Sequence, residues 1–288
     1  MAHDYNSQDI KILEGLEAVR VRPGMYIGST GPKGLHHILW EIVDNAIDEA
    51  ANGFADKVEV VLYKDGSVSV EDNGRGIPTD IHKQAGVSGV QVVFTQLHAG
   101  GKFNNENYSF SGGLHGVGAS VTNALSEWLE VEVYNKTIYK MRFHSYYDKT
   151  RKKMISGEPE EPLQNTRIKT DKHGTFVRFK PDKDVFETVE FSLETIAKRL
   201  RELAFLNKGI SIKLTDLRDD DKFYSKTFKY DGGLVDYVLY LNEGKMKLYD
   251  LPVYAKTEKD GILIEFAIQH TDSYTESVFS FVNNIPTP

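Results

Sequence analysis

Four glycines lie within the seven residues Gly112–Gly118, immediately before a stretch, residues 117–125, whose pattern predicts a helix. Glycine costs backbone entropy on folding, so this density is kept where a chain bends tightly or approaches a ligand closely. Glycine-rich backbone that opens into a helix presents free N–H groups and the positive end of the helix dipole. The segment therefore predicts a tight connection that suits a phosphate group.

A second constraint is an amphipathic helix predicted over residues 35–51, with apolar side chains at helical spacing on one face. The opposite face carries three acids and an amide, namely Glu41, Asn45, Asp48 and Glu49. An acid beside an amide can activate a water molecule and hold a hard cation, and His37 lies one turn earlier, where it can orient Glu41. An acidic helix face is more often simply solvated, and this stretch alone leaves that interpretation open.

The segment Asp72–Gly76, with the sequence Asp-Asn-Gly-Arg-Gly, follows a predicted pair of strands. Asn-Gly between apolar strands is the strongest short hairpin signal, so a plain turn is the simpler interpretation of this segment alone. The familiar phosphate loops do not fit this chain. No Gly-x-x-x-x-Gly-Lys-Ser/Thr occurs, and the glycines at 113, 116 and 118 reverse the dinucleotide fingerprint. A nucleotide site here requires another class of fold.

The acidic helix, Asp-x-Gly-x-Gly, the glycine-rich segment and a later Gly174-Thr175 together resemble the GHKL ATPase superfamily. More specific stretches, at residues 14–28, 41–50, 97–103 and 111–118, are similar to the N-terminal part of the B subunit of bacterial gyrase and topoisomerase IV. The resemblance implies an α+β fold, a GHKL (Bergerat-type) sandwich of a mixed, mainly antiparallel sheet with helices on one face. We expect an ATPase domain with an N-terminal dimerisation arm at residues 1–220 and the truncated start of an α/β transducer domain at residues 221–288.

The resemblance also implies ATP and magnesium as ligands, and it assigns roles to individual residues. Glu41 matches the general base that polarises the attacking water, His37 the residue that supports it, and Asn45 the magnesium ligand. Asp72 matches the acceptor of the adenine amino group, a suitable partner because a carboxylate only accepts and the amine donates. The other nucleotide contacts it implies are Tyr5, Glu49, Arg75, Gly76, Ile77, Pro78, Gly101, Lys102, Tyr108, Leu114, His115, Gly116, Val117, Gly118 and Thr175.

The composition of the chain excludes several classes of protein and site. The 288 residues can bury a full core, and no apolar run approaches the roughly 18 residues of a membrane span, so we expect a cytoplasmic protein. The absence of cysteine excludes disulfides and thiolate metal sites. A net charge of −7 argues against the whole chain being a general binder of the nucleic-acid backbone.

The implied function is the ATP-operated clamp of a type II DNA topoisomerase. Tyr5 would enter a neighbouring protomer, which implies an ATP-dependent homodimer. The topoisomerase A subunit would bind through regions absent here, and DNA would be a partner of the holoenzyme. Aminocoumarin inhibitors would bind at the ATP site, although Asn135 stands where many gyrase B proteins carry an arginine that contacts them. Phe94 and Ser126-Glu-Trp128 lean faintly toward topoisomerase IV.

Two other functions stay open. One is a different GHKL ATPase, such as a mismatch-repair protein, a chaperone or a histidine kinase. The other is a fragment that binds ATP without efficient turnover, since the family's lysine that reaches the γ-phosphate is expected beyond Pro288.

The remaining elements are predicted from periodicity. Strands are expected at residues 57–63, 67–71, 128–135, 138–146, 175–179, 210–216 and 261–270, and helices at residues 87–97, 193–206 and 234–241. Residues 147–172 have no clear period and are predicted to be a loop or an irregular hairpin.

Overall fold

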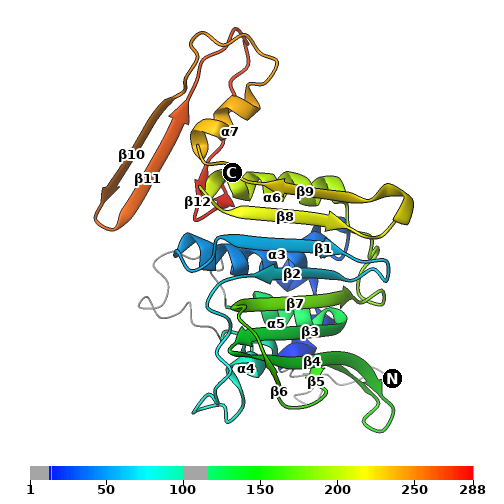
Figure 1. Ribbon diagram of the computed structural model, residues 1–288. Helices are drawn as coiled ribbons and strands as arrows, with labels where there is room; N and C mark the ends of the chain where they lie inside the picture. Colours follow the sequence, from blue (N-terminus) through cyan, green and yellow to red (C-terminus); the bar gives the residue numbers. More distant parts are fainter. Residues whose placement is uncertain (1–12, 14, 100–115, 288) are drawn as a thin grey trace, which may run out of the picture.

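The structure, a computed structural model, describes residues 13, 15–99 and 116–287. Its central feature is a nine-stranded sheet (Figure 1). The strands are β1 (Lys57–Leu62), β2 (Val68–Asp72), β3 (Ser126–Asn135), β4 (Thr137–Asp148), β5 (Lys153–Pro159), β6 (Gln164–Lys169), β7 (Gly174–Pro181), β8 (Ser211–Asp216) and β9 (Tyr224–Phe228). Their order is β5-β4-β3-β7-β2-β1-β8-β9, with β6 paired to β4. β1 and β8 are parallel and the other pairs are antiparallel, which confirms the expected mixed, mainly antiparallel sheet.

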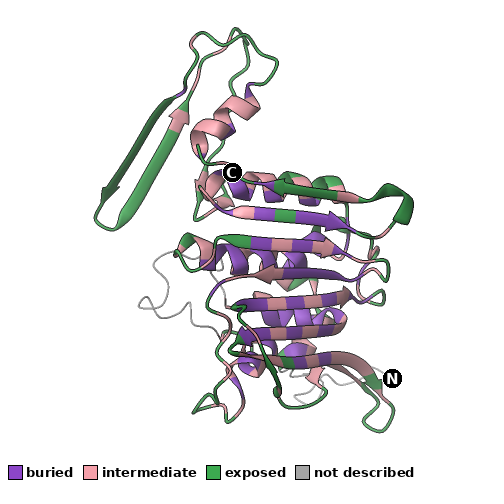
Figure 2. Cartoon of the chain, viewed as in Figure 1, coloured by how far each residue is buried: buried purple, intermediate pink, exposed green. Residues whose placement is uncertain are grey.

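One face of the sheet is buried and the other meets solvent, because side chains alternate along each strand. In β1, Val58, Val60 and Leu62 are buried, while Glu59 and Val61 between them are half-buried. The same alternation recurs along β3 and β7 (Figure 2). The sheet therefore offers one apolar face for a second layer.

Helices form that second layer behind the sheet (Figure 1). They are α1 (Gly15–Val21), α2 (Gly24–Ile27), α3 (Pro32–Ala51), α4 (Gly89–Thr95), α5 (Gly118–Ala124) and α6 (Leu193–Leu206). In α3, Leu35, Ile38 and Leu39 are fully buried in the core, as the apolar spacing predicts. The helix begins at Pro32, earlier than predicted, because proline suits the first turn, where the backbone N–H has no partner within the helix.

A smaller unit follows the sheet. It comprises α7 (Leu234–Leu241), the hairpin β10 (Val253–Lys259) and β11 (Ile262–Ile268), and the short pair β12 (Phe281–Val282) and β13 (Ile285–Pro286). The β10–β11 hairpin extends away from the sheet and is mostly exposed (Figures 1 and 2). The domain boundary at residue 220 stays a prediction. β9 lies beyond it and still pairs with β8 in the large sheet.

Residues 147–172 contain two strands, β5 and β6, both paired to β4. The prediction of a loop is therefore wrong, and the irregular hairpin is the better description, since the β4–β5 pairing shifts register between His144 and Tyr146. Neither strand alternates between buried and exposed residues: β6 is almost wholly exposed, and β5 is mostly half-buried. A strand without one clearly buried face has no period-2 pattern for the sequence to reveal.

Membrane-spanning segments were not expected from the sequence. Among the described residues, no helix is long and apolar enough to cross a membrane.

Candidate active site

The Glu41 carboxylate lies between α3 and the start of α5. His37 Nε2 is 3.2 Å from Glu41 Oε1, one turn earlier on α3. The hydrogen bond to Glu41 raises the pKa of His37 against the opposing effect of burial, so the ring is held as a donor to the carboxylate. A Cβ built on Gly118 would lie 1.7 Å from Glu41 Oε2. Glycine at position 118 is therefore what allows the first turn of α5 to approach that oxygen.

Thr122 holds α5 in this position against α3. Its Oγ1 is 2.9 Å from the Ile38 carbonyl oxygen and 3.0 Å from the Gly118 carbonyl oxygen, and its side chain is buried. Just before the helix, Gly116 has φ +59°, a value that favours glycine, and Val117 occupies the N-cap position of α5 without a side-chain capping hydrogen bond. Gly118 thus lies beside Glu41, and Gly116 and Val117 lead directly into that contact.

The polar face of α3 is not a solvated surface. Asp48 is 3% exposed and Glu49 is 8% exposed, whereas Asn45 and Glu41 are half-buried. Two charged side chains this deeply buried require partners, because an unpaired buried charge is costly. The solvated-face interpretation that the sequence left open is therefore wrong for the C-terminal half of this helix.

Glu49 is paired with Arg75 from the segment that follows β2. Arg75 Nε donates to Glu49 Oε2 at 3.1 Å, and Nη2 donates to Oε1 at 2.8 Å, a bidentate arrangement. The backbone N–H of Arg75 also donates to Oε2, at 2.9 Å. The guanidinium carbon lies 3.6 Å from the centre of the Phe54 ring. Glu49 therefore orients the Arg75 side chain and the backbone of the Asp72–Gly76 segment together.

Asp72 lies at the end of β2, beside the start of β7. Burial raises the pKa of its carboxyl to about 6, and the negative charges of Glu49 and Glu71 act in the same direction. The backbone N–H groups of Gly74, at 2.7 Å, and of Thr175 donate to this carboxylate and partly oppose the rise. A carboxylate that is difficult to ionise and is oriented by backbone donors is a candidate acceptor for a ligand.

The Gly174-Thr175 pair packs against the Asp72–Gly76 segment. Gly174 has φ +113°, and a Cβ built on it would lie 2.0 Å from the Asp72 carbonyl oxygen. Thr175 Oγ1 accepts a hydrogen bond from the Ile77 N–H at 3.2 Å. Gly76, at φ +79°, makes the turn into Ile77 and the exposed Pro78. The structure thus brings together two predicted nucleotide contacts, Ile77 and Thr175, that lie 98 positions apart in the chain.

Six predicted site residues lie outside the described part of the chain: Tyr5, Gly101, Lys102, Tyr108, Leu114 and His115. Conversely, sequence reasoning gave no role to three residues that hold the Asp72–Gly76 segment, namely Phe54, Asn73 and His173. Asn73 Oδ1 accepts from the N–H groups of Asp56 and Lys57 at 3.0 and 2.9 Å. In the sequence, the only indication of a role for these residues was that they lie within or near the recognised motifs: Asn73 is part of Asp72–Gly76, and His173 directly precedes Gly174.

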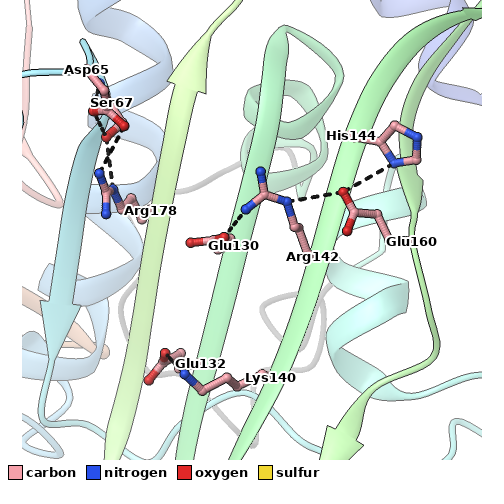
Figure 3. Close-up of polar contacts among 9 residues, drawn as sticks. All are labelled: Asp65, Ser67, Glu130, Glu132, Lys140, Arg142, His144, Glu160 and Arg178. Atoms are coloured by element: carbon pink, nitrogen blue, oxygen red, sulfur yellow. Dashed lines mark hydrogen bonds and ion pairs between the residues drawn. The ribbon is translucent and has the colours of Figure 1, made fainter.

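The solvent face of the sheet carries polar side chains that neutralise one another (Figure 3). Arg142 pairs with Glu130 and, at 3.1 Å, with Glu160, while Lys140 pairs with Glu132 at 2.6 Å. These residues line a hollow of about 250 Å³. Because it lies on the face without helices (Figure 1) and neither Glu41 nor Asp72 lines it, this hollow is separate from their site.

Two known family models match the chain. A model described as "Histidine kinase-, DNA gyrase B-, and HSP90-like ATPase" matches residues 30–185, more than half of the chain. A second model, described as DNA gyrase B, matches residues 233–288. The first match covers strands β1 to β7 and helices α3, α4 and α5, and the second covers the smaller unit.

Curated relatives extend this similarity over nearly the whole chain. The B subunit of DNA gyrase from Thermotoga maritima is 52% identical over 98% of this chain and 43% of its own length. The B subunit of DNA gyrase from Staphylococcus aureus strain Mu50 is 51% identical over 99% of this chain and 42% of its own length. The chain therefore spans less than half the length of these relatives.

A solved structure is similar in fold. It is the 43K ATPase domain of Thermus thermophilus gyrase B in complex with an aminocoumarin, with a TM-score of 0.80 and 38% identity. The match covers 94% of this chain and 66% of that one. The similarity confirms the expected α+β architecture of the GHKL type.

Proposed function

This chain belongs to the family of histidine kinase-, DNA gyrase B- and HSP90-like ATPases, and we propose that it is the ATP-binding and ATP-hydrolysing clamp of a type II DNA topoisomerase. The observation that carries the proposal is the position of Glu41. Its carboxylate is held by His37 on one side and lies against the glycine that begins α5 on the other. A carboxylate base beside the glycine-rich start of a helix is positioned to act on a water molecule next to a phosphate.

The two ends of the proposed site have different roles. At one end, Asp72 would accept the adenine amino group, with Thr175, Gly76, Ile77 and Pro78 around the base. At the other end, Glu41 would polarise the attacking water. Helix α3 connects the two ends, because it carries Glu41 at one end of the site and Glu49, the partner of Arg75, at the other. The two residues are eight positions apart, which is about 12 Å along the helix axis. One rigid helix would therefore set the separation between base recognition and water activation.

Magnesium fits the proposed site as a companion of the nucleotide. Asn45 supplies a hard amide oxygen on the same face of α3, one turn from Glu41. The described residues contain no group of three or more histidine, aspartate or glutamate side chains that could hold a metal. From the family resemblance we assign Asn45 as the protein ligand, with phosphate and water oxygens expected to complete the shell, as is usual for Mg²⁺. The ion would neutralise charge on the phosphates.

The activity of the whole enzyme is proposed from the relatives. We propose ATP-dependent dimerisation through Tyr5, coupling to DNA strand passage with an A subunit, and a cytoplasmic location. The two curated relatives named above are gyrase proteins, which favours gyrase over the faint lean toward topoisomerase IV. We also propose that aminocoumarins bind the ATP site, because the similar Thermus thermophilus domain is described in complex with one.

ATP turnover tests this proposal. We expect this chain to bind a non-hydrolysable ATP analogue, and a chain extended past Pro288 to hydrolyse ATP faster than this one. Glu41→Ala in the extended chain is the matched control and should bind the analogue but lose turnover. Turnover that is unchanged in Glu41→Ala would refute the assigned base. Equal turnover with and without the extension would refute the need for a residue beyond Pro288.

Light scattering tests the clamp. The extended chain should form dimers in the presence of the analogue and fewer dimers in its absence, because a ligand that binds the closed state better shifts the equilibrium toward it. An extended chain that stays monomeric in both conditions would refute the clamp.

A further inference from the structure

Two backbone segments pack directly against each other on the adenine side. A Cβ on Gly174 would lie 2.0 Å from the Asp72 carbonyl oxygen, and a Cβ on Gly76 would lie 3.1 Å from the Gly174 carbonyl oxygen. This spacing leaves no room for side chains between the segments. Their relative position is therefore set by the hydrogen bonds that join them.

His173 makes one of these bonds. Its Nδ1 lies 2.9 Å from the carbonyl oxygen of Gly74. A carbonyl oxygen only accepts, so Nδ1 carries the proton and donates, whether the ring is neutral or charged. The Ile77 N–H to Thr175 Oγ1 bond joins the same two segments at their other end. The His173 side chain thus anchors Gly74 from the neighbouring segment.

The Gly74–Arg75 peptide group is held at both ends. Its carbonyl oxygen accepts from His173, and its N–H donates to Glu49 Oε2 at 2.9 Å. The N–H of Gly74 itself donates to Asp72 Oδ1 at 2.7 Å. Glycine rotates its peptide planes more freely than other residues, so without these bonds the Gly74 N–H could turn away from the carboxylate. Through Gly74, the His173 hydrogen bond therefore influences the orientation of the Asp72 carboxylate.

We propose that His173 is a positioning residue for adenine recognition: it fixes Gly74 and, through the Gly74 N–H, the orientation of the Asp72 carboxylate. This role rests on the proposed ATP site. The His173 side chain is exposed, so a single hydrogen bond in contact with water sets the size of the effect, about threefold to tenfold in affinity. The effect should be confined to ligands that present the 6-amino group to Asp72.

Three substitutions separate this role from a general structural one. His173→Ala removes the donor. His173→Asn keeps it, because asparagine Nδ2 is bonded to Cγ as Nδ1 is in histidine. His173→Gln carries its donor one bond further along, at the position that corresponds to Nε2. Each protein is titrated by calorimetry with a non-hydrolysable ATP analogue and with the corresponding purine riboside triphosphate, which lacks the 6-amino group.

We expect His173→Ala and His173→Gln to bind the ATP analogue threefold to tenfold more weakly than the unsubstituted chain, and His173→Asn to bind it normally. All four proteins should bind the purine analogue equally. Unchanged ATP affinity in His173→Ala would overturn the role, as would an equal loss for both nucleotides or a loss in His173→Asn. If the unsubstituted chain bound neither nucleotide, the ATP site itself would be refuted, and the role of His173 with it.

Discussion

Replacing Asp72 by alanine should change the stability of the protein in a way that depends on pH. Burial, with the nearby charges of Glu49 and Glu71, raises the pKa of this carboxyl from 3.8 to about 6. Each pKa unit corresponds to about 1.4 kcal/mol, so keeping Asp72 ionised in the folded state costs about 3 kcal/mol.

The sign of the effect follows from proton binding. At pH 7.5 the carboxyl is ionised in both the folded and the unfolded states, so the cost is fully present. Between pH 6 and pH 4 the folded state holds a proton that the unfolded state lacks, so this group's contribution to stability rises as the pH falls. By pH 5, roughly half of the cost is relieved.

Urea unfolding at pH 7.5 and pH 5 measures this contribution. The unfolding free energy of Asp72→Ala minus that of the unsubstituted chain should be larger at pH 7.5 than at pH 5, by about 1 to 2 kcal/mol. Asp171→Ala, at an exposed position in the loop before β7, is the control for the loss of an aspartate. A difference for Asp72→Ala that is equal at the two pH values would refute the reasoning.

The same variant tests the function of the carboxylate. At pH 7.5 it should bind a non-hydrolysable ATP analogue roughly thirtyfold more weakly, as expected for a charged hydrogen bond worth about 2 kcal/mol. Unchanged affinity would refute the assignment of Asp72 to adenine, whatever the stability measurement showed.

Three further predictions concern other parts of the molecule. Glu41→Ala in a chain extended past Pro288 should lower ATP turnover roughly a hundredfold while analogue affinity changes little; a parallel loss of both would make Glu41 a binding residue. Asp182→Ala should lower the unfolding free energy by about 3 kcal/mol or more in urea, because it leaves Arg20 buried without its ion-pair partner; the exposed Lys183→Ala is the control. Asn135→Arg should bind novobiocin about tenfold more tightly and the ATP analogue equally well, because an arginine can stack on the inhibitor and donate in a fork; equal novobiocin affinities would contradict this.

The elements with one buried face could be predicted from the sequence. The apolar spacing of α3 and the alternation in β1 each report directly on which side chains are buried, since burial repeats with the geometry of the element. The motifs, through their resemblance to a known family, also indicated the candidate site residues Glu41 and Asp72. Short-range pattern therefore determined most of the elements and the identity of the candidate site.

Tertiary structure decided how those pieces meet. Gly118 lies against Glu41, and His173 reaches Gly74 across 99 positions, because strands and helices distant in the chain are neighbours in the folded sheet and its helical layer. No periodicity encodes such contacts, since they depend on the register of β7 beside β2 and on the packing of α5 against α3. The exposed strand β6 escaped prediction for a related reason: backbone pairing with β4 forms it, and its side chains carry no burial pattern.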